Sequence, residues 1–201
     1  MNEKFFDLSR EKQDRMINGA LEIFAKNGYR HASTDDMVKA VGISKGLWFH
    51  YFGSKEGIYV FVYDYCAKYM LLELSTIIDE TRKDYFERIR QIALTKTRVY
   101  RNYPYLEMFL DRAAQETEET VAAQIAESRQ IYETRIENLL RTTEIESVSD
   151  KMRREQIKKI LDYSIKGIFI ESIQQKIDSE NVYREIQAYI ELMKDMTQNL
   201  P

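Results

Sequence analysis

The chain has 201 residues, a net charge of −3 at neutral pH, and a composition that is 44% hydrophobic and 31% charged, which is ordinary for a folded globular protein. Only seven Gly and two Pro interrupt it, which favours long helices. The single cysteine, Cys66, excludes an internal disulfide and indicates a reducing compartment. The opening residues lack a signal-peptide pattern and the longest apolar run, residues 58–63, is too short to cross a bilayer, so we expect a cytoplasmic protein that does not contact a membrane.

The first predicted helix runs from Arg10 to Asn27. Gly28 follows as its stop, and apolar residues recur at helical spacing along one face. The residues of this face are Met16, Ile17, Ala20, Leu21 and Phe24.

Two short helices joined by a glycine turn are predicted next. Ser33 is a good N-cap for the first of them, and Gly42 is able to take the left-handed conformation of a tight helix exit. Ser44 caps the second helix only two residues later, a gap typical of a helix-turn-helix corner. The apolar stripe of the first short helix consists of Met37, Val38 and Val41.

The second short helix carries the residue types that duplex DNA requires. A helix N-terminus offers free N–H groups and a positive partial charge to phosphate, and Ser44 and Lys45 stand there. Gly46 permits a close backbone approach, and Leu47 is suited to apolar contact with a thymine methyl group. Trp48 and Phe52 are expected in the core. The predicted DNA contacts are Thr34, Ser44, Lys45, Gly46, Leu47, Phe49, His50, Tyr51 and Lys55.

The charge distribution is compatible with this interpretation. Residues 1–55 hold nine Lys/Arg against seven Asp/Glu, a net charge of +2, so the remaining residues carry −5. An acidic remainder discourages that part of the chain from binding nucleic acid.

The segments ALEIFAKNGYRHAST and VGISKGLWFHYFGSKEGIY resemble the DNA-binding segment of the TetR family of transcriptional regulators. The chain departs from the family at Leu47, where a small hydroxyl residue is common, and at Phe49, where a phosphate-binding tyrosine is common. The resemblance implies an all-α fold with a three-helix helix-turn-helix DNA-binding domain over residues 1–53, its recognition helix at about 44–50. It further implies a helical-bundle domain over residues 54–201 that binds an effector and dimerises.

The later helices follow from the few breaks in the chain. Ser54 caps a helix from Lys55 into the 70s, and Ser149 or Asp150 and then Ser179 cap the last two helices, which end near residues 176 and 198. The helices between them are predicted over residues 85–100, 105–116 and 120–141.

The last two helices have more than one apolar stripe, as either a plain bundle core or a dimer interface requires. The family resemblance favours the interface, since a two-fold dimer presents two recognition helices to two major grooves. We therefore predict a homodimer that uses Ile157, Leu161, Ser164, Ile168, Val182, Ile186, Tyr189 and Met193.

An aromatic-rich middle region corresponds to the part of the family that holds the effector cavity. Tyrosines suit such cavities because they combine an apolar body with a polar handle, although core packing is the alternative for each one. Glu107 and Asp111 either face solvent or place a carboxylate near a cationic ligand. The predicted ligand contacts are Tyr63, Tyr100, Tyr103, Glu107, Phe109 and Tyr132.

Enzymatic and metal-binding functions are not favoured. His31, His50 and Cys66 lack the paired spacing of a metal site, and no phosphate loop, nucleophile elbow or catalytic set is recognisable, so we predict neither metal nor cofactor. The leading hypothesis is a repressor that binds a palindromic double-stranded DNA operator and is released by a small apolar or aromatic ligand. The alternative is a DNA-binding regulator or architectural protein controlled by a protein partner.

Overall fold

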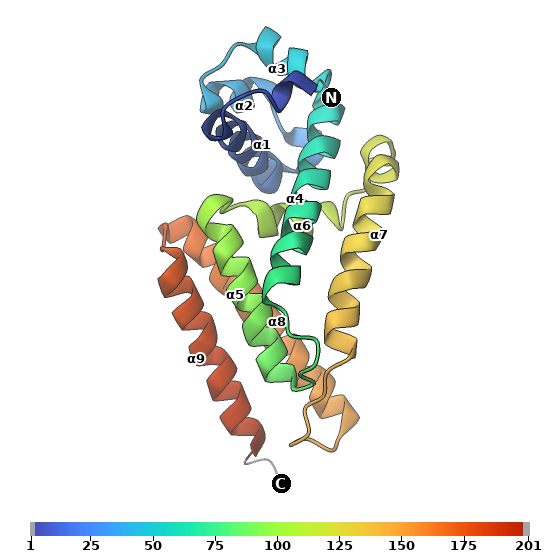
Figure 1. Cartoon of the computed structure of the whole chain (residues 1–201), viewed down its shortest axis with the longest axis vertical. Coiled ribbons are helices and arrows are strands. Elements are labelled where there is room, and N and C mark those ends of the chain that lie inside the picture. Colours follow the sequence, from blue (N-terminus) through green and yellow to red (C-terminus); the bar gives the residue numbers. More distant parts are fainter. Residues whose placement is uncertain (1–2, 199–201) are drawn as a thin grey trace. The chain divides into compact units, whose positions relative to one another are not determined.

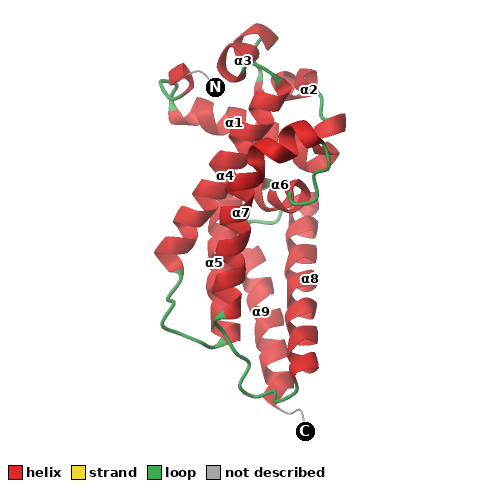
Figure 2. Ribbon diagram, turned by 90° about the vertical axis from the view of Figure 1, so that its right-hand side faces the viewer, coloured by secondary structure: helices red, strands yellow, loops and turns green. Residues whose placement is uncertain are grey.

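The computed structural model describes residues 3–198, and this part of the chain is built from helices and connecting loops (Figures 1 and 2). The one β-bridge in this part of the chain is isolated and parallel, and it joins Asp84 to Glu144. The all-α class predicted from the sequence is confirmed. The elements are η1 (Glu3–Phe5), α1 (Arg10–His31), α2 (Thr34–Val41), α3 (Lys45–Phe52), α4 (Lys55–Ile77), α5 (Tyr85–Asn102), α6 (Leu106–Ala113), α7 (Glu119–Arg141), α8 (Lys151–Gln175) and α9 (Ser179–Gln198).

Local capping chemistry sets most of the helix ends. Gly28 leaves the helical conformation at φ 70°, so regular α1 stops there as predicted and one further turn follows to His31. The Ser54 hydroxyl accepts a hydrogen bond from the Gly57 amide at 3.0 Å, and the Asp150 carboxylate accepts one from the Arg153 amide at 2.7 Å. The cap predicted for α9 was wrong by one residue, because the carboxylate of Asp178, not Ser179, accepts the amides of the first turn.

The chain forms two compact units. The first comprises Met1–Tyr69 and Asn102–Glu133, and the second comprises Met70–Arg101 and Thr134–Pro201. Helices α4 and α7 therefore contribute residues to both units. The functional division at residue 53 stays a prediction.

Aromatic side chains hold the first unit together. Phe24 of α1, Tyr59 of α4 and Phe109 of α6 contact one another, with ring centroids 4.9 to 6.0 Å apart. Such pairs add to the stabilisation that burial itself supplies. Cys66 lies fully buried in α4 as a small apolar residue, and burial raises the pKa of its thiol well above the ordinary value.

The second unit packs α8 against α9 (Figure 1). Its core draws on these two helices, on α5 and on the loop before α8, through Tyr85, Phe86, Ile89, Ala93, Tyr100, Ile145, Val148, Ile157, Leu161, Ile165, Ile168, Phe169, Val182, Ile186 and Ile190.

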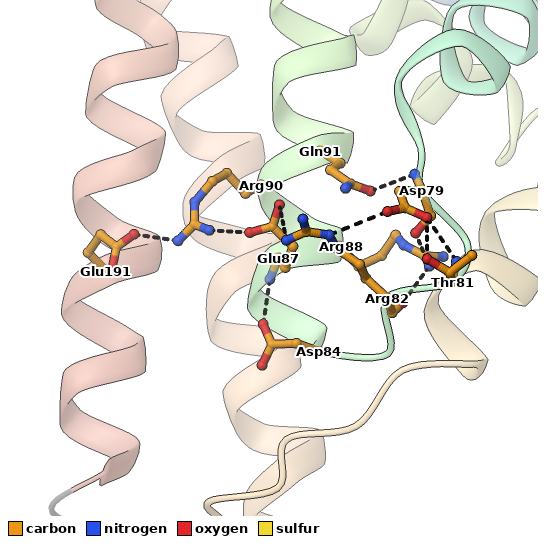
Figure 3. A network of polar contacts seen from close by, with 9 residues as sticks. All are labelled: Asp79, Thr81, Arg82, Asp84, Glu87, Arg88, Arg90, Gln91 and Glu191. Carbon is orange, nitrogen blue, oxygen red and sulfur yellow. Dashed lines mark hydrogen bonds and ion pairs between the residues drawn. The ribbon is translucent and has the colours of Figure 1, made fainter.

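A buried arginine fixes the loop between α4 and α5 in the second unit. Arg88 is 1% exposed, and its guanidinium donates hydrogen bonds to the carbonyl oxygens of Leu139, Arg82 and Asp79 at 2.9, 2.9 and 3.3 Å. Figure 3 shows it beside a second arginine, Arg90, whose guanidinium bridges Glu87 of α5 and Glu191 of α9. A buried cation needs such hydrogen bonds to offset its lost hydration.

Candidate DNA-binding site

Two capped helices and a left-handed glycine form the corner α2–α3. The Ser33 hydroxyl accepts a hydrogen bond from the Asp36 amide at 3.3 Å, and the Ser44 hydroxyl accepts one from the Leu47 amide at 3.2 Å. Between them Gly42 takes φ 74°, where a side chain would be strained. The predicted helix-turn-helix corner and its caps are confirmed, and Ser44 begins α3 with its first amides unpaired within the helix.

Two further glycines set how closely the helices around α3 approach. A Cβ placed on Gly19 of α1 would lie 2.4 Å from a methyl group of Val41 in α2, and a Cβ on Gly57 of α4 would lie 2.2 Å from the carbonyl oxygen of Phe52 in α3. Both distances are far below van der Waals contact. The orientation of α3 therefore depends on Gly57, which sequence analysis did not single out.

One face of α3 is open to solvent and the other is packed. Trp48 and Phe52 are buried, as predicted. Trp48 contacts Phe52 in the structure, with ring centroids 5.1 Å apart. The open face presents Lys45, Gly46, His50 and 41% of Leu47, with Phe49 half-buried beside them. This face has the mixture of cation, apolar group and bare backbone that groove recognition uses.

Tyr51 occupies a different environment from its predicted neighbours on the DNA face. It is 8% exposed, and its ring packs edge-to-face on Phe5 of η1 with centroids 6.0 Å apart. Any contact between Tyr51 and DNA is thus confined to the small part of the side chain at the surface. Thr34, in the first turn of α2, is half-buried.

The two lysines predicted at phosphates already have partners within the chain. The Lys45 ammonium lies 2.8 Å from a carboxylate oxygen of Asp35, and both side chains are well exposed, so this pair is weak and exchangeable. The Lys55 ammonium donates to the carbonyl oxygen of Arg30 at 3.1 Å and lies over the Tyr29 ring. Partial burial lowers the pKa of Lys55. Lys55 therefore braces the end of α1 in this structure.

A polar stripe on α1 receives the segment between α5 and α6. Asp14, Asn18 and Glu22, spaced four residues apart, lie on one face of the helix. The Tyr103 hydroxyl donates to Asp14, the Asn18 amide donates to the carbonyl oxygen of Asn102 at 2.9 Å, and the Tyr105 hydroxyl donates to Glu22 at 3.3 Å. This seam was not predicted, because its two sides are 80 or more residues apart.

Arg112 of α6 extends the contact to the end of α1. Its guanidinium donates to the carbonyl oxygens of Ala25 and Lys26, both at 3.1 Å, and lies 3.0 Å from the position of a Cβ on Gly28. These are carbonyls that the helix leaves unpaired when it ends at Gly28. A side chain from outside the helix-turn-helix thus caps the helix that supports it.

The predicted ligand residues belong to both units. Tyr100 belongs to the second unit, where its hydroxyl donates to the carbonyl oxygen of Ile177 at 3.0 Å, whereas the other five lie in the first unit. Tyr63 and Phe109 are fully buried and pack on each other at 6.2 Å. Tyr103 is part of the α1 seam, and burial followed by its bond to Asp14 raises its pKa.

Glu107, Asp111 and Tyr132 lie close together in the first unit. Burial, and then the negative charges of Glu107 and Asp111, raise the pKa of the Tyr132 hydroxyl well above its usual value. Glu107 and Asp111 are both half-buried, so neither side chain is fully exposed to solvent.

The predicted dimer residues divide between core and surface. Val182, Ile186 and the inward residues of α8 are buried within their own unit, so they are core residues, whereas Tyr189 is exposed. Ser164 and Met193 are half-buried. The inward residues of α8 are Ile157, Leu161 and Ile168.

A second, outward apolar stripe on α8 and α9 is exposed, and of its residues only Tyr189 was among the predicted dimer contacts. On α8 it follows heptad spacing through Ile160, Tyr163, Gly167 and Ile170, and on α9 it consists of Tyr189, Leu192 and Met196. Period alone could not separate it from the core stripe, because both helices are apolar on two faces.

Within residues 3–198, no helix is both long and apolar enough to span a bilayer. The same residues contain no group of three or more His, Cys, Asp or Glu side chains placed to hold a metal ion.

Comparison with known proteins supports the helix-turn-helix assignment. Residues 16–60 match the model of the family described as "Bacterial regulatory proteins, tetR family". An uncharacterised helix-turn-helix regulator, YuxN of Bacillus subtilis, is 38% identical over 56 residues, which is 28% of this chain and 19% of that protein. IcaR of Staphylococcus aureus, named a negative regulator of a biofilm operon, is 33% identical over 58 residues, 29% of this chain and 31% of that protein. The matched segments therefore span less than a third of each relative's own length.

Solved structures extend the likeness to the whole fold. A TetR-family regulator from Chloroflexus aurantiacus superposes with a TM-score of 0.59 over 98% of this chain and 96% of its own, at 19% identity. PfmR of Thermus thermophilus gives a TM-score of 0.54 over 90% and 97%, at 21% identity. At these identities the likeness concerns the fold. The matched helix-turn-helix segment thus resembles the DNA-binding part of TetR-family regulators, and the chain shares the all-helical fold of their solved structures.

Proposed function

We propose that this protein is a transcriptional repressor that binds a near-palindromic DNA operator as a homodimer. The observation that carries the proposal is the open face of α3, where Lys45, Gly46, Leu47 and His50 follow directly on the Ser44 cap. A helix start of this kind places unpaired amides and a cation against phosphate while Leu47 reaches base edges. We assign DNA binding to residues 1–53 and the remaining functions to residues 54–201, in the cytoplasm.

The outward stripe on α8 and α9 supports the dimer. Tyr163 is 69% exposed and Ile160 is 50% exposed, which is costly for large apolar groups in contact with water. A Cβ on Gly167 would meet nothing within 4 Å, so the fold of a single chain does not require glycine there. Glycine inside a helix costs about 1 kcal/mol relative to alanine. A close helix-helix contact with a second copy, which needs a residue without a side chain, would account for glycine at this position.

Selection of bound DNA from a random pool tests DNA recognition. We expect a near-palindromic consensus whose half-site centres are about one or more helical turns apart, together with a dimer by sedimentation velocity. A monomer that binds a palindrome tightly at micromolar concentration, or a pool with no consensus, would contradict the proposal.

Repression and release by a small apolar or aromatic ligand form the second part of the proposal. The dimer has one arrangement of its two α3 helices that fits the operator and another that does not. A ligand that binds the second arrangement more tightly lowers operator affinity, at most by the ratio of its affinities for the two arrangements. Titration of the operator complex with pooled compounds tests this part. Release by one class of compound is the expected result.

A second candidate function is a DNA-binding regulator or architectural protein controlled by another protein. The observation that favours it is the packing of Tyr63, Tyr103 and Phe109, three predicted ligand contacts that are fully buried against other side chains. If no compound shifts operator affinity or thermal stability, this candidate gains support.

A further inference from the structure

A cavity of about 380 Å³ lies within the second unit, between α5, the end of α7 and the first half of α8. It contains none of the ligand residues predicted from the sequence. Its floor is formed by Tyr85, Ile89, Ile92 and Ala93, all buried on α5. Ile136 and Leu140 of α7 and Ile165 of α8 complete the apolar lining. Its volume falls in the range of small-molecule sites, which combine an apolar body with a few polar groups.

Some charged side chains of the lining are paired with other residues, and others have no oppositely charged partner within the described part of the chain. Two of the three carboxylates in the lining are neutralised by lysines, since Glu155 pairs with Lys158 at 3.0 Å and Asp162 pairs with Lys166 at 3.2 Å. The third is Glu137, on the exposed side of α7.

Two cations of the lining remain uncompensated. Arg141 donates to the neutral side-chain oxygen of Asn138 at 3.2 Å, and within residues 3–198 neither Arg141 nor Lys159 has a carboxylate partner. The ammonium of Lys158, which also pairs with Glu155, lies 5.7 Å from the centroid of the Tyr85 ring at the edge of the floor. Counted over the whole lining, four cations (Lys96, Arg141, Lys158 and Lys159) face three carboxylates (Glu137, Glu155 and Asp162), so positive charge exceeds negative charge by one around an apolar floor.

The cavity and the outward apolar stripe of α8 use different residues, and Lys159 lies at the border between them, one turn before Tyr163. The residues of α8 that line the cavity are Glu155, Lys158, Lys159, Asp162 and Ile165, whereas the stripe passes through Ile160, Tyr163, Gly167 and Ile170.

We propose that this cavity binds a small amphiphile with an apolar body and an anionic head group. The body occupies the floor made by α5, and the head lies at Lys159 and Arg141, where a carboxylate or sulfonate makes charge-assisted hydrogen bonds. Binding by this cavity is independent of DNA recognition. Its role as the effector site rests on the proposed function.

Three probes with nearly equal alkyl chains and different head groups separate charge from apolar burial: decanoate and decyltrimethylammonium, each below its micellar concentration, and decanol, below its solubility limit. Isothermal titration of the full chain should give saturable binding with decanoate at least about tenfold tighter than decyltrimethylammonium, a difference of about 1.4 kcal/mol. Equal affinity for the two ions, or no saturable binding of decanoate, would overturn the proposal.

Variants locate the site. Ile136→Trp, at a half-buried lining position, should abolish binding of all three probes. Lys159→Gln, at an exposed position that does not threaten folding, should weaken decanoate about three- to tenfold and leave decanol unchanged. Lys151→Gln, on the same helix outside the lining, is the matched control and should bind as the parent does. An unchanged decanoate affinity in Lys159→Gln places the head group elsewhere and refutes the assignment.

Adding decanoate to the operator complex separates this proposal from the previous one. Decanoate can bind saturably, in a way that depends on Lys159, and still leave operator affinity unchanged. That result supports the proposed ligand site and argues against its role in operator release. Release by other compounds, with no decanoate binding, upholds ligand-controlled repression and refutes the cavity.

Discussion

Substitution of Gly46 by alanine tests whether the backbone of α3 approaches DNA. Gly46 has helical dihedral angles, and a Cβ placed on it meets nothing within 4 Å. The free protein therefore gains helix propensity, up to about 1 kcal/mol, which corresponds to a rise in Tm of about 2–4 °C for a chain of this size. If the groove lies against this backbone, the added methyl group costs about 1–3 kcal/mol in the complex, as overpacking does elsewhere.

Two measurements on the same protein separate these effects. Circular dichroism melting should show an equal or higher Tm for Gly46→Ala, and fluorescence anisotropy with the selected operator should show a loss of about 5- to 150-fold in affinity. A raised Tm with unchanged DNA affinity would refute the close approach at Gly46. A lowered Tm would refute the open position of this residue in the free protein.

Gly57→Ala is the matched control, because its Cβ lies 2.2 Å from the Phe52 carbonyl oxygen. We expect the opposite stability effect, a loss of about 1–3 kcal/mol in urea unfolding. DNA affinity should fall as well, since the end of α3 must move. A Gly57→Ala protein with parental stability would show that the α3–α4 corner relaxes at no cost.

Five other substitutions have defined outcomes. Ser44→Ala should lower the free energy of unfolding by about 1 kcal/mol through loss of the α3 cap, and a urea titration measures it. Lys45→Ala should reduce the salt slope of operator binding by about 1, and equal slopes for this variant and the parent would remove Lys45 from the phosphate contacts. Lys55→Ala loses the hydrogen bond to Arg30, so its main effect should be a lower thermal stability, with only a small change in the salt slope. Gly167→Ala should weaken the dimer in sedimentation velocity without lowering the melting temperature of the single chain. A dimer of unchanged strength would exclude a close helix-helix contact at residue 167. Arg88→Leu should cost about 3–5 kcal/mol in urea unfolding by leaving buried carbonyls unpaired, and a cost below 1 kcal/mol contradicts this role.

The parts of the fold that depend on neighbouring residues were predictable. Ser33, Gly42 and Ser44 set the α2–α3 corner through bonds and dihedral angles only a few residues long, so the sequence pattern carries the geometry. Trp48 and Phe52 were expected in the core; they lie on the face of α3 opposite Gly46 and His50, and both are buried.

The parts that depend on distant partners were not predictable from one sequence. Lys55 has the charge and position of a phosphate contact, yet it bonds to the carbonyl of Arg30, 25 residues away. Tyr103 has the character of a ligand contact, but its hydroxyl is engaged by Asp14. On α8 the stripe of Ile157 and the stripe of Ile160 have the same periodicity, and only packing against α9 assigns one of them to the core.

The acceptors chosen by Arg88 have a consequence for how this protein can change in evolution. All three are main-chain carbonyl oxygens, at residues 79, 82 and 139, which every amino acid supplies. Substitutions at positions 82 and 139 that keep the backbone path therefore leave the anchor intact, while a change at Arg88 removes it completely. The contact thus constrains only the codon of Arg88. Among related sequences, we therefore expect no correlated substitutions between the loop after α4 and the end of α7.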